Sequence, residues 1–197
     1  GVDGSKSAPD MLQNSAYYNY YSDKTTSVVE LPFYGTDTSF FVVLPKNTKT
    51  FKSMRKGAAW DAKYWNEVLS TLNQGQTAYG SVTLPKFSFD YSVSMKEGDK
   101  LTVDTGLNFL FQDNADFSNL AAQGEPNTKV GLIKQDTKVE LDENGVKAAA
   151  VTTIAGLESA TMIPNSEFEP VVERPFFFAI ADKKTGSIYF LGSVVKP

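Results

Sequence analysis

The chain of 197 residues contains no cysteine and no histidine. The missing cysteine excludes disulfide bonds, thiolate metal sites and a cysteine nucleophile. The missing histidine removes the usual general base of serine and cysteine hydrolases, the common zinc ligand and the usual pH switch. We therefore expect neither a metal site nor a cofactor, and only carboxylate chemistry stays open for an enzyme.

Long apolar runs and an excess of positive charge are also missing. No apolar run approaches the length of a membrane span, and the first residues show no basic-then-apolar signal peptide. The chain has 19 Lys and Arg against 23 Asp and Glu, which gives a net charge of -4. Because the basic residues are scattered through the sequence, neither nucleic acid nor an anionic membrane is expected as the main partner.

What the sequence does contain is a strand-dominated pattern. Strands are predicted over residues 17–21, 27–33, 39–44, 81–91, 133–142, 176–181 and 188–195. A helix is predicted over residues 61–73, with Asp61 as its N-cap. Residues 93–112 stay ambiguous, because Gly98 and Gly106 weaken a helix that Met95 and Leu101 suggest. The length fits one sizeable domain of the α+β class.

The clearest periodic segment is the strand over residues 133–142. Its charged side chains alternate with uncharged ones without a break, which is typical of a half-buried antiparallel strand. The predicted inward side chains are Ile133, Gln135, Thr137, Val139 and Leu141, and the outward ones are Lys134, Asp136, Lys138, Glu140 and Asp142.

A run of small residues, 143–157, follows this strand, and residues 148–157 carry no charge. If Lys147 faces solvent, the opposite parity faces inward, and it holds only uncharged residues: Val146, Ala148, Ala150, Thr152, Ile154 and Gly156. Such a segment could enter a sheet as a strand without burying a charge, and it could also stay in water. A flexible Gly/Ala-rich linker or surface loop explains the same composition.

Seven motifs, in sequence order and spread over nearly the whole chain, resemble those of the serpin family. They are VELPFYG at 29–35, FVVLP at 41–45, LPKF at 84–87, ADFS at 115–118, VELDENGVKAAA at 139–150, ERPFFF at 173–178 and FLGSVVKP at 190–197. The resemblance covers the C-terminal half of a single serpin domain, without the helical N-terminal half. It implies mixed sheets with a few helices and an exposed reactive loop at about residues 143–172.

The resemblance further implies a protease inhibitor that acts as a suicide substrate. The partner would be a target protease, which cleaves the loop and forms an acyl-enzyme. The cut loop would then enter the large sheet beside the strand at 133–142. The resemblance also implies a protein that is extracellular or periplasmic, and monomeric once complete. The hinge of this loop would comprise Glu143, Gly145, Val146, Ala148, Ala149, Ala150 and Thr152.

The position of the scissile bond is less closely defined. The family's usual spacing from Glu143 places the residue before the cut near Ser159, but the stretch up to Pro175 is several residues longer than usual. The candidates are therefore Ser159, Ala160, Thr161, Met162 and Ile163. No Lys or Arg lies between Ala148 and Glu173, which favours elastase-, chymotrypsin- or subtilisin-like targets over trypsin-like ones. A papain-like cysteine protease stays open.

Two other functions compete with inhibition. A non-inhibitory serpin could act as a carrier, chaperone or storage protein, although such members tend to carry bulky or charged hinge residues. An enzyme could pair carboxylates as acid and base, with candidates Asp113, Asp116, Glu140, Asp142 and Glu143. The simpler interpretation of Glu140 and Asp142 is the solvated face of a strand.

Overall fold

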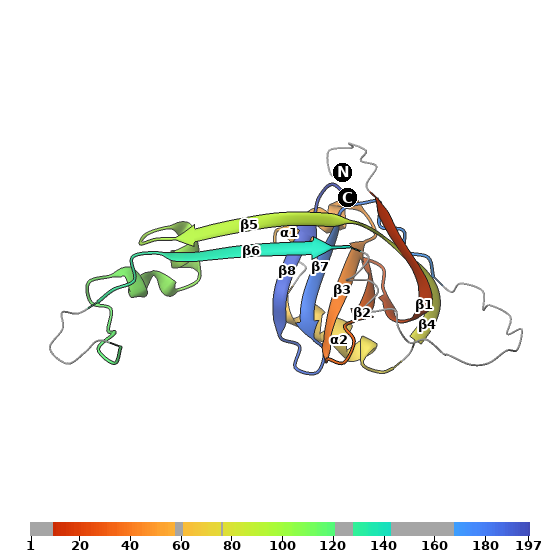
Figure 1. Cartoon of the computed structure of the whole chain (residues 1–197), viewed down its shortest axis with the longest axis horizontal. Coiled ribbons are helices and arrows are strands. Elements are labelled where there is room, and N and C mark those ends of the chain that lie inside the picture. Colours follow the sequence, from red (N-terminus) through yellow and green to blue (C-terminus); the bar gives the residue numbers. More distant parts are fainter. Residues whose placement is uncertain (1–9, 58–60, 76, 121–127, 143–167) are drawn as a thin grey trace, which may run out of the picture. The chain divides into compact units, whose positions relative to one another are not determined.

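The computed structural model describes residues 10–57, 61–75, 77–120, 128–142 and 168–197. Contacts divide the chain into two compact units, Gly1–Phe87 with Leu141–Pro197 and Ser88–Glu140. The first unit holds a six-stranded sheet and two helices, and the second holds most of a two-stranded sheet and two short helical turns (Figure 1). The prediction of a strand-dominated α+β protein is confirmed.

The six-stranded sheet has the order β4-β1-β2-β3-β7-β8, and all its neighbouring strands are antiparallel. Two chain segments far apart in sequence thus pair inside this sheet, where β3 lies beside β7. The strands are β1 (Met11–Ser22), β2 (Thr26–Pro32), β3 (Thr38–Pro45), β4 (Thr77–Pro85), β7 (Phe176–Asp182) and β8 (Ile188–Val194).

Strand β3 lies at the centre of the core, as its run of apolar residues predicts. Residues on both of its faces are buried, and Phe41 and Val43 are completely inaccessible to solvent. Helices α1 (Thr48–Arg55) and α2 (Ala62–Leu72) cover one face, where Trp65 of α2 packs edge-on against Phe41 with ring centroids 5.1 Å apart. The Trp65 indole also donates a hydrogen bond of 3.0 Å to the Gly186 carbonyl between β7 and β8.

One of these helices is predicted from the sequence and the other is not. Helix α2 begins after Asp61, whose carboxylate accepts a hydrogen bond of 2.8 Å from the Tyr64 N–H, as expected of an N-cap. Helix α1 buries only Phe51 and Met54, too few apolar positions for a helical pattern to stand out. The available signal is its cap, Asn47. No helix of the described residues is long and apolar enough to cross a membrane.

The predicted strand at 81–91 is in fact two strands in different sheets. Strand β4 ends at Pro85, and β5 (Phe87–Met95) pairs with β6 (Ile133–Leu141) in the two-stranded sheet. Proline has no N–H to continue a ladder, and a new strand begins two residues later. The prediction of one continuous strand is wrong because the apolar alternation runs through this break.

The ambiguous residues 93–112 resolve into two short helical turns separated by glycine. Helix α3 (Lys100–Asp104) follows Gly98, and the 3-10 helix η1 (Leu107–Phe111) follows Gly106. Both glycines have positive φ, 76° and 73°, a conformation that side chains disfavour. Gly98 precedes α3, and Gly106 separates α3 from η1. This interruption is why no single helical period fits residues 93–112.

Candidate functional site

The predicted hinge and scissile-bond residues lie outside the described residues. They are Glu143, Gly145, Val146, Ala148, Ala149, Ala150 and Thr152 of the hinge, and Ser159, Ala160, Thr161, Met162 and Ile163 of the bond. The structure instead describes where the chain enters and leaves this region. Strand β6 precedes it, and residues 168–172 follow it.

Strand β6 confirms the predicted alternation, with one exception. Val139 and Leu141 are buried, with 8% and 7% of their surface exposed, and Ile133 and Thr137 are half-buried. Gln135, predicted to face inward, is exposed, and a polar amide is well solvated there. The charged residues of the other face form two ion pairs, Lys134–Asp136 at 2.9 Å and Lys138–Glu140 at 3.6 Å. These pairs are more than half exposed, so they stabilise the strand little.

Strand β6 lies in a two-stranded sheet with β5, and not in the large sheet that the resemblance implies. The second edge of β6 therefore has no strand neighbour among the described residues. An open edge presents N–H and C=O groups that can pair with an added extended segment. The residues that directly follow β6 are therefore attached to a strand whose edge could pair with them.

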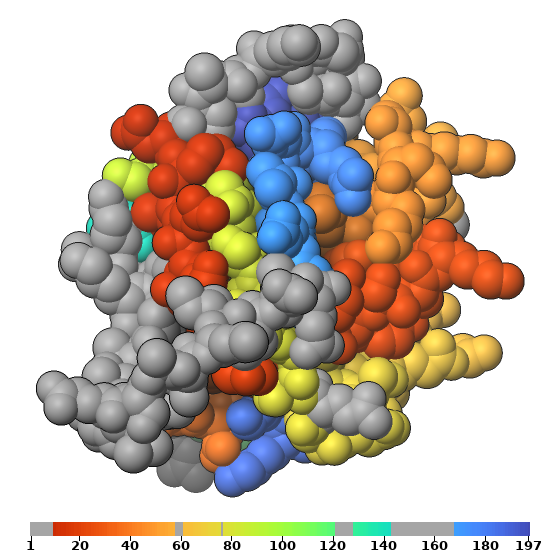
Figure 2. Space-filling model, turned by 90° about the vertical axis from the view of Figure 1, so that its right-hand side faces the viewer, coloured from red at the N-terminus to blue at the C-terminus, as the bar shows by residue number. Residues whose placement is uncertain are grey.

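The downstream end is fixed by backbone hydrogen bonds to β4. The N–H groups of Ser81 and Thr83 donate to the carbonyls of Phe168 and Pro170 at 3.2 Å and 3.1 Å, and the Val172 N–H donates to the Thr83 carbonyl at 2.9 Å. These bonds form two parallel bridges to β4, at the edge of the six-stranded sheet. Figure 2 shows this stretch in light blue beside the yellow-green of β4.

Phe168 holds this contact by aromatic packing. Its ring stacks on Tyr20 with centroids 4.2 Å apart and planes 6° from parallel, and it meets Tyr18 edge-on at 6.2 Å. Phe168 passes so close to Gly80 that a Cβ there would lie 2.5 Å from its ring. Glycine inside a strand marks this close approach, and it is the signal by which the sequence could have revealed the contact. We call residues 168–172 with their partners on β1 and β4 the downstream anchor.

A buried carboxylate stabilises the sheet that carries the downstream anchor. Glu30 on β2 is 1% exposed and accepts hydrogen bonds of 2.7 Å from the Asn19 amide and from the Ser39 hydroxyl. The Lys183 ammonium lies 3.7 Å from the same carboxylate. Glu30 belongs to the VELPFYG motif, and its buried carboxyl group contacts residues of β1, β3 and the turn after β7 from its place on β2.

The described carboxylates of the enzyme hypothesis are engaged separately. Lys129 bonds Asp113 and holds the pKa of that carboxyl below its usual value, and the hydrogen bonds from Ser118 do the same for Asp116. Glu140 pairs with Lys138. A lowered pKa makes Asp113 and Asp116 poor general acids, so these two residues offer little support for acid–base catalysis. Within the described ranges, no three acidic side chains gather as a metal site would require.

Comparison with known proteins agrees with the motifs. A family model described as "Serpin (serine protease inhibitor)" matches residues 2–197. Iripin-3 of Ixodes ricinus is 32% identical over 178 residues, which cover 90% of this chain and 42% of that protein. Intracellular coagulation inhibitor 2 of Tachypleus tridentatus is 31% identical over 183 residues, which cover 93% of this chain and 42% of the relative.

A likeness in fold accompanies the likeness in sequence. The native structure of the thermophilic serpin tengpin matches with a TM-score of 0.75 and 23% identity, over 100% of this chain and 48% of tengpin. The Manduca sexta serpin-12 structure matches with a TM-score of 0.74 and 20% identity, over 99% and 48% of the two chains. The chain spans less than half the length of the relatives it matches.

Proposed function

The chain belongs to the serpin family, and on that premise we propose that it carries the reactive loop of a protease inhibitor that acts as a suicide substrate. The name of one relative, a coagulation inhibitor, agrees with inhibition. The single observation that carries the proposal is what lies on either side of residues 143–167: a strand, β6, with one edge unpaired among the described residues, and the packed downstream anchor.

In the proposed reaction, the protease nucleophile attacks a carbonyl carbon in the loop, and the peptide bond breaks to give an acyl-enzyme and a new amino terminus. The cut frees residues 143–157 from the downstream anchor but leaves them attached to β6. An extended strand rises about 3.3 Å per residue, so residues 143–157 can span about 50 Å. The nine residues of β6 span only about 30 Å. The freed segment is therefore long enough to fold back along the open edge.

The small side chains of the hinge suit this insertion. A new strand gains roughly 0.5–1.5 kcal/mol for each backbone hydrogen bond formed. The inward parity carries no charge, whereas an unpaired buried charge would cost several kcal/mol. Because the relatives are about twice as long, we expect the trap to need the other half of the fold, which supplies the opposite side of the insertion site.

The expected targets have an apolar or small specificity pocket. The loop offers no basic side chain between Ala148 and Glu173, so a trypsin-like acidic pocket finds no partner. A proline after the cut disfavours cleavage at Ile163, which leaves the bonds after Ser159, Ala160, Thr161 and Met162.

The test is cleavage mapping with a protease panel of elastase, chymotrypsin, subtilisin and trypsin. Intact-mass spectrometry should find the new ends between residues 159 and 163 with at least one of the first three proteases. Inhibition of trypsin alone would contradict the proposed specificity. Cleavage only outside residues 143–172 would contradict the loop assignment itself.

A further inference from the structure

Helix α1 concentrates positive charge that the rest of the described chain does not balance. Lys49, Lys52, Arg55 and Lys56 are all exposed, and none of them forms an ion pair with a described residue. By contrast, seven lysines elsewhere in the described ranges lie within 4.0 Å of a carboxylate. Four basic residues within eight positions of the sequence, 49–56, thus have no ion-pair partner among the described residues.

The spacing of the lysines does not stabilise helix α1. Lys49 precedes Lys52 by three residues and Lys52 precedes Lys56 by four, and like charges at these spacings repel each other. Lys52 and Arg55 lie in the last turn, where the helix dipole favours a cation, but Lys49 lies in the first turn, which contains no acid. The dipole therefore explains the charges at the C-terminal end and leaves Lys49 unexplained.

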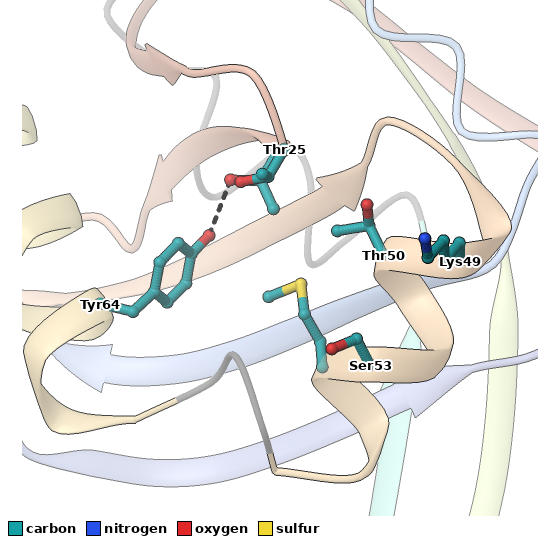
Figure 3. Close-up of a pocket in the computed structure, with 7 residues that line it drawn as sticks. Thr25, Lys49, Thr50, Ser53 and Tyr64 are labelled. Atoms are coloured by element: carbon teal, nitrogen blue, oxygen red, sulfur yellow. Dashed lines mark hydrogen bonds between the residues drawn. The ribbon is translucent and has the colours of Figure 1, made fainter.

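A cavity of about 260 Å³ opens beside Lys49, between α1, α2 and the start of β2 (Figure 3). Its inner part is formed by Met54, which is 3% exposed, and by Tyr64, whose hydroxyl lies 3.0 Å from the Thr26 hydroxyl. Burial raises the pKa of Tyr64, so its ring bears no charge at neutral pH. Thr50 and Ser53 add hydroxyls from α1, on the same side as Lys49.

Asp23, the acid that shares the turn before the cavity, forms no ion pair with these lysines. Asp23 precedes Thr25 at the cavity and accepts hydrogen bonds of 2.6 Å from the N–H groups of Thr25 and Thr26, and one of 3.0 Å from the Tyr21 hydroxyl. Its carboxylate serves the turn between β1 and β2. The cations of α1 and the largely apolar interior of the cavity therefore stay available together.

We propose that α1 and this cavity bind an acidic peptide segment, with one apolar side chain in the cavity and flanking carboxylates on Lys49, Lys52 and Lys56. At 1.5 Å per residue, these lysines span about 10 Å, the reach of two or three carboxylates of a short peptide. A long polyanion would need a longer stripe and would meet a chain whose net charge is -4. The proposal is independent of the reactive loop.

The test measures binding of a fluorescein-labelled peptide, EELEE, to the 197-residue chain by fluorescence anisotropy. The triple variant Lys49→Ala/Lys52→Ala/Lys56→Ala should weaken binding by about tenfold or more, since each exposed charge contributes modestly and the three act together. The control Lys100→Ala/Lys134→Ala/Lys138→Ala removes the same net charge from residues outside α1 and α2 and should change binding less than about twofold. All substituted side chains are exposed, and calorimetry should show folded variants.

The cavity is tested by the peptide EEAEE, which should bind more weakly than EELEE, and by Ser53→Phe, which fills the cavity and should remove that preference. Equal binding of the two peptides to the wild-type chain would overturn the proposal. An equal loss in the control triple variant would also overturn it, as would tighter binding of a single-stranded oligonucleotide or a heparin fragment than of EELEE.

Discussion

The two ends of the proposed loop are held in opposite ways. Downstream, residues 168–172 are fixed by three backbone hydrogen bonds to β4 and by the stacking of Phe168 on Tyr20. Upstream, β6 presents exposed ion pairs and one edge without a described neighbour. Aromatic burial is worth several kcal/mol, whereas exposed ion pairs are worth little. A cut between the two ends would therefore free the upstream segment and leave the downstream anchor in place.

The largest effect is expected from a charged substitution in the hinge, which should prevent the upstream segment from entering the sheet. Ala150→Glu puts a charge on the parity that enters the sheet, which costs several kcal/mol and should lower the yield of covalent protease complex by about 100-fold. The complete inhibitor would then behave as a substrate, as a denaturing gel would show. Ala149→Glu is the matched control, because its side chain has the outward parity. A stable complex with Ala150→Glu would contradict the parity assignment.

At the downstream anchor, Phe168→Ala should destabilise the fold by about 3–5 kcal/mol, because it removes a buried ring and its stacking on Tyr20. Urea unfolding measures the change. Phe109→Ala is the control, since that ring is 57% exposed and its loss should cost far less. Equal effects of the two substitutions would show that the packing around Phe168 does not hold the downstream end.

The buried carboxylate of Glu30, which pairs with Lys183, should contribute more to stability than the exposed Lys134–Asp136 pair on β6. Glu30→Ala removes the acceptor of the half-buried Asn19 amide and of the buried Ser39 hydroxyl, and it removes the partner of Lys183, which should cost about 3 kcal/mol of unfolding free energy. Thermal and urea unfolding both report this change. A cost below about 1 kcal/mol would indicate that the carboxylate is not buried as described.

The smallest effect is expected on β6. Lys134→Ala removes an ion pair in which both side chains are more than half exposed, so stability should change by less than about 1 kcal/mol. The shift should shrink further in 1 M salt, which screens exposed charges. A loss well above 1 kcal/mol that shrinks in salt would mean that β6 is held by its charges, and the contrast between the two ends would then be weaker than described.

The sequence predicts those elements whose pattern lies within one short segment of the chain. The alternation in β6, the apolar run of β3 and the cap at Asp61 are local, and all three predict their elements correctly. Pro85 ends β4 within an alternating stretch, and the pairing of Phe168 with Gly80 joins positions far apart in sequence. No periodic pattern carries such long-range contacts. The hinge and bond assignments rest on the family resemblance and stay predictions.

The most direct measurement of the central claim is intact-mass analysis of the complete inhibitor after reaction with chymotrypsin or elastase. The account predicts a covalent adduct whose mass equals the protease plus the inhibitor cut between residues 159 and 163, with the downstream peptide released on denaturation. If every protease that cuts this bond cleaves it completely, stays active and forms no adduct, the chain is not part of a suicide inhibitor.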